Sequence, residues 1–281
     1  MKTLFILLLN IIKNLIKMKT LFILLFVVLF AAACDKKESD NTNPLPPPPP
    51  PPPADTLITE TFTFLSNGTA TEGKIYLPDS YDSNKNLPAI YLIDFTEQHF
   101  AVAKDEFEKV VAGVEKIEGF DALVVTLKEH LDIDSKPQVF QKYYEIFKNM
   151  TSYVDSNYTS NTSRTFIGRG SEAGIVIMTL FLEESESSVF DNFIATDSPG
   201  DFNSTIVDMI ENDDFPQNKL NKKLHFSFST TNNHEECTAM INTINGAQYP
   251  WLQFESIEYH NSNYEDTYPA SFAEGIEYIF K

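Results

Sequence analysis

From Thr56 onward, the hydrophobic positions alternate between the spacing of strands and the spacing of helices. Residues 57–65 and 73–77 are rich in β-forming side chains, and the loop between them begins with Asn67-Gly68, which is typical of a β-hairpin. Further short apolar runs predict strands at 89–93, 122–125 and 165–167, near Phe193, and at 224–228 and 254–259.

Helical spacing separates these runs. Phe107, Val110, Val111 and Val114 recur every three or four residues, and a similar stripe runs over 140–150. Helices are also expected over about 173–182, across Ala239, and from about Ala270. Strands that alternate with helices favour right-handed crossovers and an α/β fold, with a mostly parallel sheet covered on both faces and a hairpin at its N-terminal end.

The N-terminus carries an export pattern. Residues 1–8 are repeated at 18–25, so Met18 is the expected start, and the second copy runs through an apolar stretch to Ala31-Ala32-Ala33-Cys34. A basic start and a short apolar run ending in small residues indicate a signal too short to span a bilayer of roughly 30 Å. Residues 31–34 resemble the lipobox of bacterial lipoproteins, although Ala31 replaces the usual leucine. The resemblance implies that residues 1–33 are removed and that Cys34 carries lipid.

A linker over residues 34–55 follows the cysteine. It contains charged residues at 35–40 and an unbroken proline run at 46–53, which in polyproline II form would be a semi-rigid spacer of roughly 25 Å. The charged stretch resembles the surface-export signals of Bacteroidota-type lipoproteins. We therefore expect a membrane-anchored lipoprotein, in the outer membrane and facing outward, with one domain over residues 56–281.

Net charge and cysteine content limit the possible binding partners of the protein and the possible roles of Cys237. Forty acidic and 21 basic residues give a net charge of -19, and no basic cluster lies beyond the first 37 residues, which argues against nucleic acid. If Cys34 is lipidated, Cys237 has no disulfide partner. Because Glu235 and Glu236 precede Cys237, its thiol pKa should be raised, and a structural role is expected.

Metal and cofactor sites are not predicted. The five histidines stand without ligand spacing, and residues 132–134 lack the rest of a calcium loop. The glycines at 168 and 170 lack the glycine-to-lysine spacing that a phosphate-binding loop requires.

Residues 164–174 (RTFIGRGSEAG) have the layout of a strand, a glycine-rich turn and a helix. Together with other segments they resemble the esterase family of α/β hydrolases that includes esterase D, feruloyl esterases and enterochelin esterases. The resemblance covers nearly all of residues 56–280. It rests on four segments, 75–82 (IYLPDSYD), 87–94 (LPAIYLID), 153–168 (YVDSNYTSNTSRTFIG) and 269–280 (PASFAEGIEYIF). It implies the α/β-hydrolase fold and a catalytic serine at the turn.

The family's nucleophile position is altered. Aligning 164–168 without a gap puts Gly170 where the family has its serine, and Glu172 where it has a small residue. Shifting the alignment by one residue makes Ser171 the nucleophile, but Arg169 then occupies a position where the family has a small side chain. Neither register satisfies the motif.

The other positions of the family's site have also changed. Tyr264 stands where the family has its histidine, and His260 lies four residues earlier. After the strand at 224–228 the nearest carboxylate is Glu235, and Phe95 replaces the glycine of the oxyanion loop. A tyrosine with a pKa near 10 is a poor general base at neutral pH.

Changes at all three triad positions favour a pseudo-esterase, which keeps the fold as a binding or structural module, because the triad acts as a unit. The alternative is a working serine carboxylesterase that uses Ser171, His260 and Glu235. A third hypothesis is glycan or peptide binding in the old cleft, with Trp251, Tyr264 and Tyr268 as stacking platforms. The ligand classes considered are thus a small ester, a glycan or a peptide.

Overall fold

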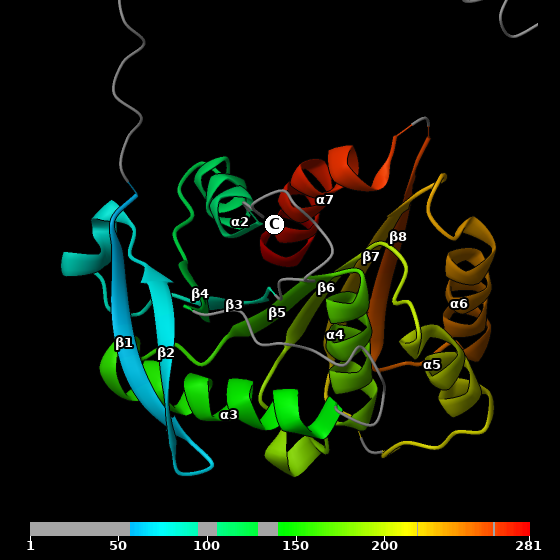
Figure 1. Cartoon of the computed structure of the whole chain (residues 1–281), viewed down its shortest axis with the longest axis horizontal. Coiled ribbons are helices and arrows are strands. Elements are labelled where there is room, and N and C mark those ends of the chain that lie inside the picture. The colour runs from blue at the N-terminus through cyan, green and yellow to red at the C-terminus, as the bar shows by residue number, and fades with distance from the viewer. Residues whose placement is uncertain (1–56, 95–105, 129–139, 218, 261) are drawn as a thin grey trace, which may run out of the picture. The chain divides into compact units, whose positions relative to one another are not determined.

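Eight strands form one sheet in the order β1-β2-β4-β3-β5-β6-β7-β8 (Figure 1). The computed structural model describes residues 57–94, 106–128, 140–217, 219–260 and 262–281. The expected export signal, Cys34, the proline run and Phe95 lie outside these residues. The strands are β1 (Thr59–Ser66), β2 (Thr69–Tyr76), β3 (Ala89–Ile93), β4 (Leu123–Leu127), β5 (Arg164–Arg169), β6 (Asn192–Thr196), β7 (Lys222–Ser229) and β8 (Leu252–Tyr259).

The pairing confirms the predicted sheet. β1 and β2 form an antiparallel hairpin, and β2 is also antiparallel to β4. All pairs from β4 through β3 to β8 are parallel. Asn67 and Gly68 both have positive φ at the hairpin turn, as the sequence of the loop suggested.

Helices cover both faces of the sheet. Strand residues such as Ile90, Leu92, Ile167 and Ile194 pack with the helices on one face, and their neighbours along the strands point to the other. The first face carries α2 (Glu106–Glu115) and α7 (Tyr264–Phe280), and the second carries α3 (Phe140–Asn157), α4 (Ser171–Leu182), α5 (Phe202–Glu211) and α6 (His234–Ala247). Short 3-10 turns lie at Asp79–Asp82 and Ser185–Ser187.

Two helices differ from the sequence-based expectation. α5 was not anticipated, although Phe202, Ile206 and Ile210 are spaced by four residues and buried. α7 begins at Tyr264 instead of near Ala270, and it contains Pro269. Asn263 caps this earlier start, because its side-chain Oδ1 accepts a hydrogen bond from the Asp266 amide at 3.0 Å.

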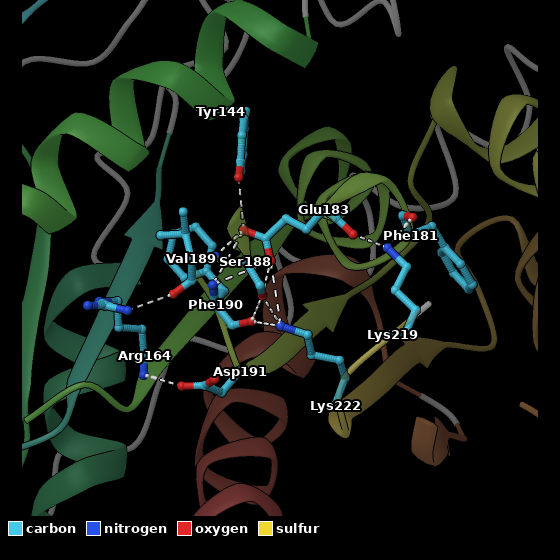
Figure 2. A network of polar contacts seen from close by, with 10 residues as sticks. All are labelled: Tyr144, Arg164, Phe181, Glu183, Ser188, Val189, Phe190, Asp191, Lys219 and Lys222. Carbon is cyan, nitrogen blue, oxygen red and sulfur yellow. Dashed lines mark hydrogen bonds and ion pairs between the residues drawn. The ribbon is translucent and has the colours of Figure 1, made fainter. Parts of the chain in front are cut away.

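A buried polar network ties together the N-terminal ends of the parallel strands (Figure 2). The Lys222 amine donates to Ser188 Oγ and the Phe190 carbonyl and lies 3.7 Å from Glu183 Oε2. Glu183 Oε1 in turn accepts from Tyr144 Oη at 3.1 Å and from the Val189 amide at 2.9 Å. Both charged side chains are almost fully buried, so the network satisfies groups that would otherwise be costly to bury.

Within the described part of the chain, no helix is both long enough and apolar enough to cross a membrane.

Candidate functional site

The turn between β5 and α4 forms a sharp elbow at the C-terminal edge of the sheet. Gly170 stands at its apex with φ 64° and ψ -128°, directly before the first residue of α4. Its amide donates to the Thr196 carbonyl at 2.8 Å, which ties the apex to the end of β6. A side chain is strained in this backbone conformation, and glycine adopts it without penalty.

Gly168, two residues before the apex, lets the strand and the helix approach closely. A Cβ at Gly168 would lie 2.7 Å from Ile93 Cγ2 and 2.9 Å from the carbonyl carbon of Glu172. No real side chain tolerates both distances without movement of the backbone. The elbow is therefore centred on Gly170. On either side of it, the backbones of Gly168 in β5 and Glu172 in α4 pack directly against each other.

Ser171 lies in a different position from the apex. It is the first residue of α4 and is half-buried. A Cβ on Gly200, in the loop before α5, would be 3.4 Å from its hydroxyl oxygen. Among the described residues, no hydrogen bond links Ser171 to a histidine. The structure thus separates the two registers that the sequence left open, because it puts Gly170 and not Ser171 at the turn.

Hydroxyl groups join the loops that follow β7 and β8. Ser229 Oγ donates to the Ser262 carbonyl at 2.5 Å, and Thr231 Oγ1 donates to the same oxygen at 2.9 Å. Thr267 Oγ1 of α7 donates to Ser262 Oγ at 2.9 Å. These bonds hold the two loops together.

The candidate acid, Glu235, and the candidate base, His260, both lie on the surface. Glu235 is exposed in the first turn of α6. The side chain of His260 is 72% exposed, and its Nδ1 lies 3.8 Å from Glu258 Oε1. Glu258 Oε1 is also 3.0 Å from Nε2 of His234. Tyr264 is the first residue of α7.

Arg169, the last residue of β5, points into the layer formed by α2 and α7. Its Nε lies 3.4 Å from Glu106 Oε1, and the two side chains are 3% and 2% exposed. The guanidinium carbon lies 4.3 Å from the centre of the Tyr268 ring. Arg169, the residue before the apex, thus contacts both α2 and α7 in the interior.

Two of the three proposed stacking platforms, Trp251 and Tyr268, do not lie on the surface. Trp251 and Tyr268 are each only 8% exposed. Trp251 stacks on Tyr249 and contacts Phe181 edge to face, whereas Tyr268 packs on Arg169 and Phe272. The expectation that these two residues present flat faces to a ligand is therefore wrong, because both rings fill the interior.

Asp197 is a buried carboxylate at this edge that sequence reasoning missed. It follows β6, is fully buried, has φ 64°, and its Oδ1 accepts a hydrogen bond from the Ser229 amide at 3.2 Å. Burial, followed by the charges of Asp197 and Glu236, raises the pKa of Cys237 to about 12. Cys237 is fully buried, which fits the structural role expected for it. The available signal for Asp197 was its position after a strand, in the turn-forming sequence Asp197-Ser198-Pro199-Gly200.

Comparison with known structures identifies the architecture. An IroE-like serine hydrolase from Shewanella oneidensis superposes with a TM-score of 0.63 and 13% identity, over 79% of this chain and 80% of that one. An S-formylglutathione hydrolase from Staphylococcus aureus superposes with a TM-score of 0.53 and 12% identity, over 82% of this chain and 99% of that one. The domain has the α/β-hydrolase fold.

A third solved structure that matches is that of a protein described as uncharacterised. An uncharacterised protein from Capnocytophaga ochracea superposes with a TM-score of 0.60 and 15% identity, over 79% of this chain but only 63% of that one. No family model matches the sequence, and no curated protein matches it. In an α/β-hydrolase the nucleophile sits at a strained turn between a strand and a helix, and in this chain that turn is the elbow at Gly170.

Proposed function

We propose that this α/β-hydrolase domain is a pseudo-esterase, which retains the fold as a binding or structural module. The observation that carries the proposal is the apex of the elbow, where the strained conformation of a nucleophile is held by a residue without a side chain. Gly170 offers no oxygen to attack an ester.

Other groups at the C-terminal edge of the sheet support the same proposal. Ester hydrolysis by a serine nucleophile needs a base that takes the proton of the serine, and a group that orients the base. Ser229 and Thr231, after β7, bond to Ser262, after β8. The two histidines beside them, His234 and His260, both lie at the surface next to Glu258. A nucleophile at Ser171 would also have to act from the first turn of α4.

Ester hydrolysis by the purified full chain tests this proposal. With p-nitrophenyl acetate, we expect the same rate for the wild-type protein, Ser171→Ala and His260→Ala, because neither residue acts in catalysis. Loss of a member of a working triad would instead lower turnover on the order of a millionfold. Any slow release of nitrophenol should persist in all three proteins. Turnover that Ser171→Ala and His260→Ala both abolish would instead establish the carboxylesterase that uses Ser171, His260 and Glu235.

We further propose that the domain is carried on a lipoprotein anchored through Cys34, in the outer membrane and facing outward. The support is the pattern of residues 18–34 and the proline-rich spacer that follows. In cells given a radiolabelled fatty acid, the wild-type chain should incorporate label and partition into detergent, and Cys34→Ser should do neither. A labelled Cys34→Ser protein would refute the anchoring site.

A further inference from the structure

The sequence contains the dipeptide Asn-Gly twice, at Asn67-Gly68 and at Asn245-Gly246. In such a pair the amide nitrogen of the glycine can attack the Cγ carbon of the asparagine side chain. Glycine leaves this nitrogen unhindered, because it carries no Cβ. Both pairs are exposed to solvent. The local sequence and the exposure of the two pairs therefore do not distinguish their reactivity, and only their backbones can.

The first pair is the two-residue loop at the tip of the hairpin formed by β1 and β2 (Figure 1). Asn67 and Gly68 have φ values of 49° and 77°, as a type I′ turn requires. In the described part of the chain, the main-chain hydrogen bonds of turns and loops include none from the Gly68 amide. A Cβ built on Gly68 would meet no atom within 4 Å. The peptide group between the two residues therefore lies in open space, with its nitrogen available.

The second pair lies inside the last turn of α6, which ends at Ala247. Within an α-helix each amide donates to the carbonyl four residues earlier, and this bond engages the nitrogen that would attack. Attack also requires the peptide group after the asparagine to rotate, which would break the helical conformation at Asn245. The same dipeptide is thus held in an open turn at one position and in a hydrogen-bonded helix at the other.

We propose that Asn67 is a site of spontaneous deamidation, and that the fold protects Asn245 from the same reaction. The Gly68 nitrogen forms a bond to Cγ of Asn67, the bond from Cγ to Nδ2 breaks, and the side-chain amino group leaves as ammonia with the proton of the Gly68 amide. Water then opens the cyclic imide at either of its carbonyls. One opening gives aspartate, and the other gives isoaspartate, whose main chain runs through the former side chain.

The two products should affect the hairpin differently. Aspartate keeps the length of the loop and is itself favoured before glycine in this turn. Isoaspartate adds a methylene group to the main chain between Ser66 and Thr69, which are paired across the hairpin. Because loop length and turn type fix the register of a hairpin, isoaspartate should loosen the pairing at this end of β1 and β2.

Storage of the purified full chain in mildly alkaline buffer, followed by peptide mapping with mass spectrometry, tests the proposal. Conversion is measured as the gain in mass when a side-chain amide becomes a carboxyl group. In the folded protein, Asn67 should convert about tenfold faster than Asn245, which corresponds to about 1.4 kcal/mol in the free energy of reaching the reactive geometry. In urea-unfolded protein the two rates should be similar. Equal rates in the folded protein, or faster conversion of Asn245, would overturn the proposal.

Matched glutamine variants identify the source of the modified protein. Glutamine cyclises far more slowly than asparagine, because its side chain is one carbon longer. Asn67→Gln should remove most of the acidic species that isoelectric focusing detects early in storage of the folded protein, whereas Asn245→Gln should leave them unchanged. If folded Asn67→Gln accumulates these species as fast as the wild type, Asn67 is not the site.

Discussion

Two glycines of this domain make opposite demands on the backbone. Gly170 has φ 64° and ψ -128° at the elbow, where a side chain is strained. Gly246 lies within α6, its φ is not positive, and a Cβ there would meet no atom within 4 Å. Gly170 is therefore required by conformation, whereas Gly246 only weakens a helix.

Substitution by alanine should affect these two glycines in opposite directions. Gly170→Ala should lower the free energy of unfolding by about 1 to 3 kcal/mol, because the strained conformation gains a Cβ. Gly246→Ala should raise it by about 0.5 to 1 kcal/mol, because alanine favours the helix. Urea unfolding of both variants measures the change. An unaffected Gly170→Ala protein would mean that the elbow relaxes at little cost.

At the scale of elements, buried charges fasten the strands at both edges of the sheet. At the C-terminal edge, Arg169 of β5 joins Glu106 of α2 to Tyr268 of α7. At the N-terminal edge, Lys222 of β7 joins Glu183 to the carbonyl of Phe190 before β6. Removing one member of such a pair leaves the other charged and unpaired in the interior. Each pair therefore couples its elements strongly.

Lys222 and Lys219 allow this coupling to be measured (Figure 2). The Lys222 side chain is 2% exposed, whereas Lys219 is half-buried and donates to the main-chain carbonyls of Phe181 and Glu183. Lys222→Met should cost about 3 kcal/mol of stability, because it leaves the Glu183 carboxylate buried without its cation. Lys219→Met should cost about 1 kcal/mol, because it loses hydrogen bonds to main-chain carbonyls and only a weaker attraction to the Glu183 charge. Equal losses in denaturant unfolding would contradict the role given to Glu183.

At the scale of the whole molecule, one buried histidine links stability to pH. His225 of β7 is fully buried, neither ring nitrogen has a partner among the described residues, and the ring faces Tyr278 of α7. Burial lowers the pKa of His225 to about 4 from an ordinary 6.5. The unfolded chain therefore binds a proton below about pH 6.5 that the folded chain accepts only near pH 4, so stability falls as the pH falls through this window.

The comparison of pH 7 with pH 5 tests this linkage. His225 should make the wild-type protein about 2 kcal/mol less stable at pH 5 than at pH 7, beyond what the carboxylates contribute. In His225→Gln this extra loss should vanish, whatever the absolute stability of the variant. The matched change His260→Gln, at an exposed position, should leave the loss in place. A pH dependence that is the same in both variants would exclude His225 as its source.

The sequence by itself determined the sheet, its N-terminal hairpin and most of the helices on both faces, although it missed α5, because hydrophobic periodicity records which side of each local segment is buried. It did not determine which residue holds the elbow, since Gly170 and Ser171 were both open until the φ of Gly170 was known. It also left the environment of Arg169, Trp251 and Asp197 undecided. Their surroundings come from α2, β6, α7 and other elements far away in the sequence. A backbone strained at one residue and a charge buried between distant helices depend on the packing of the complete domain, and only the tertiary structure decides them.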